Sequence, residues 1–156
     1  MCEGPVLYAE DDENDVYFMT SAFAKVVPQV PLVVVRNGKE AIEYLNAAKG
    51  TNKWPRLLLL DLKMPFMSGL EVLSWAREQE KFASLPIAIL TSSTEPYDLQ
   101  YCRSKGANAY LEKISQAELP GLIKKLIGCA TITAPDEHLT FEWRQEYVGL
   151  KWMSSF

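Results

Sequence analysis

The 156-residue chain has few cysteines, a single histidine and no long uninterrupted hydrophobic run. Its three cysteines are widely spaced and form no CxxC pair, which argues against a disulfide framework and a cysteine-based zinc site. No window reaches the roughly 18 consecutive apolar residues of a membrane-spanning helix. The net charge of −4, without a basic patch, argues against a nucleic-acid-binding surface. We therefore expect a cytoplasmic protein with no membrane and no nucleic-acid partner.

What the chain does contain is a regular alternation of short aliphatic runs and helical periodicity. With 48% apolar residues it can bury the core of one domain. Runs of strand length separate stretches whose apolar residues recur at helical spacing, the pattern of βα units around a parallel sheet. The expected strands are Val6–Ala9, Pro31–Val35, the leucines of 57–60, Pro86–Leu90 and Asn108–Glu112. The sequence therefore predicts an α/β fold with helices on both faces of a doubly wound sheet.

Local signals predict where several helices begin. Asp12 or Asn14 is placed to cap the first helix, Asn37-Gly38 is read as the turn before the second, and Ser68 precedes the third. Ser115 and Glu118 have the spacing of a capping box for the fifth, although Pro120 disturbs that interpretation.

Polar residues follow four of the expected strands directly. Glu10 and Asp11 follow the first, Asp61 the third, Thr91 the fourth, and Lys113 the fifth. Because ligands of open α/β sheets lie beyond the carboxyl ends of the strands, these side chains are expected at one edge. Clustered carboxylates repel one another unless a cation neutralises them, and oxygen ligands suit Mg²⁺. Any one of these residues alone would more often cap a turn or face solvent.

Taken together, these motifs resemble the receiver domains of bacterial response regulators. The resemblance lies in VLYAEDDEND, in LLLLDLKMPFMSG with Pro65 and Gly69 after the aspartate, in IAILTSS and in GANAYLEK. It covers residues 4–128, and two of its segments, PLVVVRNGKEAIEYL and LLLLDLKMPFMSG, particularly resemble single-domain regulators associated with bacteriophytochrome-type and other sensor kinases. It implies a flavodoxin-like fold whose five parallel strands have the order 2-1-3-4-5.

The resemblance also implies a chemistry for the acidic residues. Asp61 would be the phosphoacceptor, attacking a phosphohistidine of a sensor histidine kinase or phosphotransfer protein. Mg²⁺ would be held by Asp11, Asp61 and the backbone carbonyl of Lys63, and through water by Glu10. Such a protein is a phosphoacceptor switch that catalyses its own phosphorylation and dephosphorylation, and is not otherwise an enzyme.

Three further residues receive roles from the same resemblance. Lys113 would pair with one phosphoryl oxygen and the Thr91 hydroxyl would donate to another. Tyr110 would swing inward when Thr91 moves, changing the face formed by the fourth helix, fifth strand and fifth helix. The output would then be a contact with a downstream protein target.

Two features of the chain depart from the receiver pattern. Lys113 is followed by Ile114, where most receivers have proline, and Lys63 places a cation where it could tune the lifetime of the acyl phosphate or simply face solvent.

Three competing functions stay open. A flavodoxin-like cofactor binder would need an anion cradle where EDDEND stands. An aspartyl-phosphate hydrolase normally needs a second acid at the position of Lys63. A receiver-shaped scaffold that is never phosphorylated is the third alternative.

Residues 129–156 form an aromatic-rich extension beyond the receiver region. It contains Phe141, Trp143, Tyr147, Trp152 and Phe156, and it is too short for a DNA-binding module. Its pattern fits either an extended arm or a short helix. We expect it to pack on its own domain or to contribute to a homodimer, because Trp and Tyr are favoured at interfaces.

Overall fold

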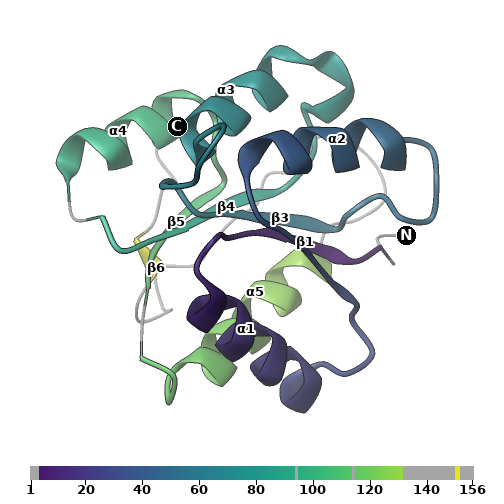
Figure 1. The fold of residues 1–156 in the computed structure, drawn as a ribbon, viewed down its shortest axis with the longest axis vertical. Coiled ribbons are helices and arrows are strands. Elements are labelled where there is room, and N and C mark those ends of the chain that lie inside the picture. The colour runs from purple at the N-terminus through teal and green to yellow at the C-terminus, as the bar shows by residue number, and fades with distance from the viewer. Residues whose placement is uncertain (1–3, 94, 114, 132–149, 152–156) are drawn as a thin grey trace.

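The computed structural model describes residues 4–93, 95–113, 115–131 and 150–151. Five parallel strands form its centre, in the spatial order β2-β1-β3-β4-β5 (Figure 1). They are β1 (Val6–Ala9), β2 (Leu32–Val35), β3 (Leu57–Leu60), β4 (Ile87–Thr91) and β5 (Ala109–Glu112). The predicted fold class and strand order are confirmed.

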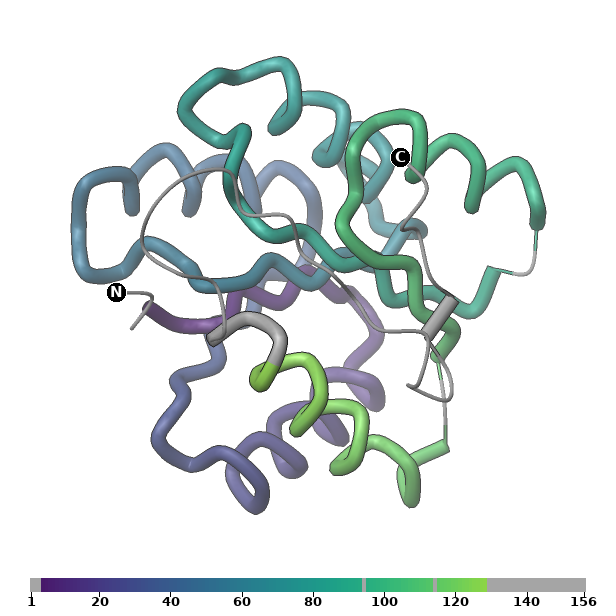
Figure 2. Tube along the Cα trace, turned by 180° about the vertical axis from the view of Figure 1, so that it is seen from behind, coloured from purple at the N-terminus to yellow at the C-terminus, as the bar shows by residue number. Residues whose placement is uncertain are grey.

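The helices cover both faces of this sheet. They are α1 (Glu13–Val26), α2 (Gly38–Ala48), α3 (Gly69–Glu78), α4 (Pro96–Ser104) and α5 (Leu119–Thr131), with a short 3-10 turn, η1 (Glu80–Phe82). α1 and α5 lie side by side on one face, and α2, α3 and α4 cover the other (Figure 1, Figure 2). None of the helices among the described residues combines the length and apolar character needed to cross a bilayer.

The aliphatic strands read as continuous runs because both of their faces are buried. In β3, Leu57 and Leu59 pack with α1 and α5, whereas Leu58 and Leu60 pack with the α2, α3 and α4 side. All four leucines are fully buried. Each contributes roughly 2 kcal/mol through burial alone, so β3 is a rigid support for whatever follows Leu60.

Two helix starts differ from the sequence predictions. Asn37 caps α2 through its side chain, and Gly38 is already the first helical residue, so the predicted turn is part of the helix start. α5 begins at Leu119, after the predicted capping box, and Ser115 and Glu118 form a separate turn. This start puts Pro120 in the first helical turn, where its missing N–H and fixed φ are tolerated.

A sixth strand extends the sheet at its β5 edge. β6 (Leu150–Lys151) pairs antiparallel with β5, with Tyr110 opposite Lys151 and Leu111 opposite Leu150. The backbone of these two residues is therefore extended. The predictions for Phe141, Trp143 and the other aromatic residues of the extension lie outside the described residues.

Candidate functional site

The backbone ladder brings Glu10 and Asp61 to neighbouring positions at one edge of the sheet. Ala9 lies opposite Leu60 in the parallel pairing of β1 with β3, so the next residue of each strand is acidic. The amide of Asp61 donates to the carbonyl of Ala9 at 3.1 Å, and the amide of Glu10 donates to Val35 at 3.0 Å. Both acidic residues are thus held by main-chain hydrogen bonds.

Close packing of the loop after β3 holds Asp61 from the other side. The amide of Gly69 donates to the carbonyl of Leu62 at 3.1 Å. A Cβ atom at Gly69 would overlap the carbonyl oxygen of Asp61, so this approach requires glycine. Phe66, at the tip of the loop, is exposed and has a positive φ of 62°.

Three carboxylates meet at this edge. Glu10, Asp11 and Asp61 each offer an oxygen atom, and the three atoms lie within 4.8 Å of one another. Glu10 is completely buried and Asp61 nearly so, whereas Asp11 is exposed. The set fits Mg²⁺, which binds oxygen ligands and keeps several waters, because the exposed side at Asp11 leaves room for water. Lys63 is exposed in the loop that follows.

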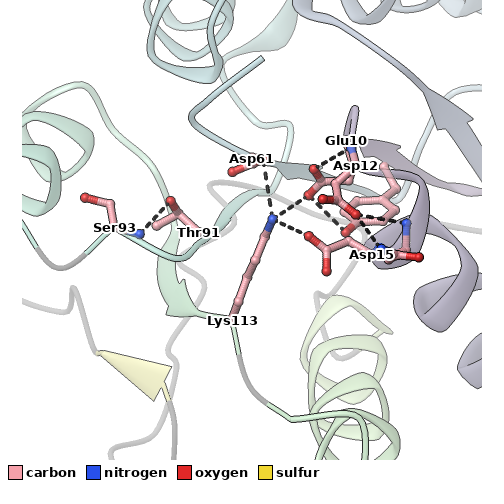
Figure 3. A network of polar contacts seen from close by, with 9 residues as sticks. Glu10, Asp12, Asp15, Asp61, Thr91, Ser93 and Lys113 are labelled. Carbon is pink, nitrogen blue, oxygen red and sulfur yellow. Dashed lines mark hydrogen bonds and ion pairs between the residues drawn. The ribbon is translucent and has the colours of Figure 1, made fainter.

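Lys113 lies among these acids (Figure 3). Its Nζ is 2.8 Å from Glu10 Oε2, 2.7 Å from Asp15 Oδ2 and 3.5 Å from Asp61 Oδ2. The lysine is positioned by its own backbone, since its amide donates to the carbonyl of Thr91 at 2.8 Å. One ammonium group therefore reaches three carboxylates, two that follow the ends of strands β1 and β3 and one on helix α1.

Burial and charge shift the protonation of this cluster. Burial raises the pKa of Glu10 to about 7, aided by the negative charge of Asp61 and opposed by the ammonium of Lys113. For Lys113, burial lowers the pKa, but hydrogen bonds to Asp15 and Glu10 outweigh it and the net pKa is raised. Burial also raises the pKa of Tyr8, whose hydroxyl donates to Glu10 at 3.3 Å. Lys113 therefore keeps its positive charge, and the two buried carboxylates at this edge, Glu10 and Asp61, outnumber the one ammonium group beside them.

The hydroxyl of Thr91 ends the neighbouring strand, β4. The side chain is 1% exposed, and its Oγ1 accepts a hydrogen bond from the amide of Ser93 at 3.1 Å. Tyr110 lies on β5, and its hydroxyl donates to the carbonyl of Ser93 at 3.4 Å. Tyr110 is 2% exposed, so its side chain is already inside the protein.

The structure thus gathers Glu10, Asp11, Asp61 and Lys113 at one edge, with Thr91 at the end of the next strand. Tyr110 does not contact the acids and is connected to Thr91 through Ser93. Asp15 is an additional contact that sequence reasoning missed. The available signal was its place in the first turn of α1, three residues after the cap Asp12, whose side chain accepts from the Asp15 amide.

Comparison with known proteins points to the same family as the sequence motifs. The family model of the response regulator receiver domain matches residues 6–124. A probable methanogenesis regulatory protein, FilR2 of Methanothrix harundinacea, is 34% identical over 109 residues, covering 69% of this chain and 70% of that protein.

Solved structures agree in fold. The phosphorylated cyanobacterial phytochrome response regulator RcpA has 26% identity and a TM-score of 0.74, covering 85% of this chain and 99% of that chain. The bacteriophytochrome response regulator RtBRR has 31% identity and a TM-score of 0.68, covering 86% of this chain and 82% of that chain.

Proposed function

Because the chain belongs to the response regulator receiver domain family, we propose that it is a single-domain response regulator phosphorylated on Asp61. The observation that carries this proposal is the position of Asp61, which lies beside the acids that follow β1 and within 3.5 Å of the ammonium of Lys113. A carboxylate in that place has both a charge partner and neighbours suited to a divalent cation. Residues 4–128 form the receiver, and residues 129–156 are an extension of it.

The proposed reaction is a transfer between two nucleophiles. An oxygen of Asp61 attacks the phosphorus of a phosphohistidine, the nitrogen–phosphorus bond breaks, and the histidine leaves with its electron pair. The product is an acyl phosphate on Asp61. The ammonium of Lys113 and the hydroxyl of Thr91 stabilise the charge on the phosphoryl oxygens, because such transfers depend mainly on positioning and electrostatics.

Mg²⁺ is the proposed cofactor of the transfer. Asp11, Asp61 and the backbone carbonyl of Lys63 would hold it directly, and Glu10 through water. When bound, the ion neutralises charge on the transferring group. The elevated pKa of Glu10 supports the assignment, since buried carboxylates in excess of nearby cations are what a divalent ion would compensate.

In the proposed reaction the donor histidine belongs to another protein. The single histidine of the chain, His138, falls in the extension and not in residues 4–128. A sensor histidine kinase or a phosphotransfer protein in the cytoplasm is the proposed donor, and the chain catalyses its own phosphorylation and dephosphorylation. Lys63 tunes the lifetime of the acyl phosphate under this proposal, and an unchanged hydrolysis rate in Lys63→Ala would contradict that role.

The proposed output is a protein contact on the surface of α4, β5 and α5. Tyr97 on α4 is 68% exposed, which gives a partner that binds this helix an aromatic side chain to bury. The aromatic extension would contribute to a homodimer. Light scattering should give the mass of a dimer for the full chain and the mass of a monomer for a chain ending at Gly128, and a monomer mass for both chains would remove the dimer from the proposal.

The experiment that tests the main proposal uses a small phosphodonor. Incubation with acetyl phosphate and Mg²⁺ should add the mass of one phosphoryl group to the full chain, and Asp61→Asn should abolish the gain. Glu13→Gln is the matched control, because it removes an exposed acid of the same region. No gain in the wild type with several donors would favour the scaffold. Steady turnover of a phosphomonoester would favour the hydrolase. Flavin absorbance of the purified protein would favour the cofactor binder.

A further inference from the structure

Asp15 makes the shortest contact with the ammonium of Lys113. The distance is 2.7 Å, against 3.5 Å from the same nitrogen to Asp61. An ammonium group has three donors, and here Glu10, Asp15 and Asp61 are the three carboxylates within reach. Each carboxylate can therefore take one donor, and Asp15 holds the lysine more closely than the acceptor aspartate does.

We propose that Asp15 is a positioning residue that holds Lys113 on the α1 side and keeps the oxygen of Asp61 available to a divalent cation and to the phosphoryl group. This inference rests on the proposed function of Asp61. Figure 3 shows the arrangement, with Asp15 and Asp61 approaching the ammonium from α1 and from the end of β3. Asp15 itself contacts neither the metal nor the phosphoryl group in this role.

The geometry gives the direction of the effect. Without the charge of Asp15, the donor of Lys113 that it occupies becomes free. Asp61 can then approach the ammonium more closely, because its contact with Lys113 is the longest of the three. A shorter bond between Lys113 and Asp61 places a positive charge on an oxygen that the cation needs. Weaker binding of Mg²⁺ should follow.

A role in stability alone does not account for the contact. The Asp15 side chain is 37% exposed and the Lys113 side chain 22%. A partly exposed ion pair of this kind contributes only modestly to folding, because solvent screens the charges and ordering two side chains costs entropy. The effect of the Asp15–Lys113 pair on the contact between Lys113 and Asp61 is therefore larger than its effect on stability.

The test is titration calorimetry of the full chain with Mg²⁺, with no phosphodonor present. Asp15→Asn should weaken the affinity for Mg²⁺ about fivefold, the order of coupling seen between groups in direct contact. Glu13→Gln removes the same charge from the same helical turn, and its first-turn place makes it the matched control for long-range electrostatics. It should change the affinity by less than about twofold, because exposed charges are screened. Asp15→Glu should restore most of the affinity.

A double-mutant cycle separates positioning from field effects. In a Lys113→Met background the lysine is absent, so Asp15→Asn should weaken Mg²⁺ binding no more than Glu13→Gln does. Equal effects of Asp15→Asn and Glu13→Gln in the wild-type background would overturn the inference. So would a fivefold effect of Asp15→Asn that persists without the lysine. Either result leaves the proposed function standing if acetyl phosphate still modifies Asp61. A wild-type protein that is never modified would instead contradict both the proposed function and the role of Asp15.

Discussion

Replacing Arg77 with alanine should destabilise the fold strongly, because one guanidinium connects three segments at the amino-terminal edge of the sheet. Arg77 is in the last turn of α3. Its Nε donates to Gly106 at 2.9 Å, and its two terminal nitrogens donate to Phe82 and Leu85 at 2.8 Å each. One of those nitrogens also donates to Asn108 Oδ1 at 2.9 Å. Four of the five donors of the guanidinium are thus used.

The size of the effect follows from these bonds. Burial lowers the pKa of Arg77 to about 10, so the side chain stays charged at neutral pH. Bonds from a charged donor contribute about 1.5–3 kcal/mol each, but water entering the vacated space replaces part of them. We expect Arg77→Ala to cost about 3–5 kcal/mol, within the range of broken hydrogen-bond networks. For a chain of this size, 4 kcal/mol lowers the melting temperature by about 10 °C.

Urea denaturation followed by circular dichroism measures the change. Arg77→Lys should recover less than half of the loss, because an ammonium cannot reproduce the planar fork. Arg36→Ala is the control, since that arginine is exposed, and its cost should stay below about 0.5 kcal/mol. A cost of Arg77→Ala below about 1 kcal/mol would refute the reasoning, because the buried carbonyls would then have other partners.

Three more predictions concern the site and the core. Gly69→Ala should lower stability and slow phosphorylation by acetyl phosphate, because its Cβ would overlap the Asp61 carbonyl; Gly121→Ala, with open space around it, should do neither. Since folding raises the pKa of Glu10 from 4.5 to about 7, the folded state binds more protons in that interval. Stability without divalent cations should fall as pH rises through it, and urea titrations of Glu10→Gln should lack that slope. In a variant whose other cysteines are serine, alkylation of Cys102 should require unfolding, because the thiol is buried and burial raises its pKa to about 12.

Features predicted correctly from the sequence are those that depend on neighbours in the chain. The four leucines of β3 are read as a buried strand because both faces of the sheet are covered, and the strand occupies Leu57–Leu60. Asp61 follows from that run, because parallel strands end at a common edge. The capping serine of α3 is likewise local: Ser68 accepts from the amide of Glu71, and the Glu71 side chain accepts from Ser68.

Features that were missed depend on partners far away in the chain. Asp15 and Lys113 are separated by 98 positions, and no spacing rule connects them. β6 pairs through two residues, too few for a period-2 pattern to be visible. The start of α5 was misplaced because Ser115 and Glu118 satisfy the capping-box spacing while their side chains bond to each other at 3.2 Å in a turn before the helix.

Ser93 shows how the hydroxyl of Thr91 is connected to α4. Its amide donates to Thr91 Oγ1 at 3.1 Å, its hydroxyl donates to Asp98 Oδ2 at 2.5 Å and accepts from the Glu95 amide at 3.2 Å, and its carbonyl accepts from Tyr110. A hydroxyl has one proton and two lone pairs, so the Ser93 amide leaves the proton of Thr91 free for a phosphoryl oxygen. Tyr110 is already buried and has no inward rotation left to make. Under the proposed function, a shift of Thr91 toward the phosphoryl group therefore reaches the first turn of α4 through Ser93 and Asp98, before Tyr110 needs to move.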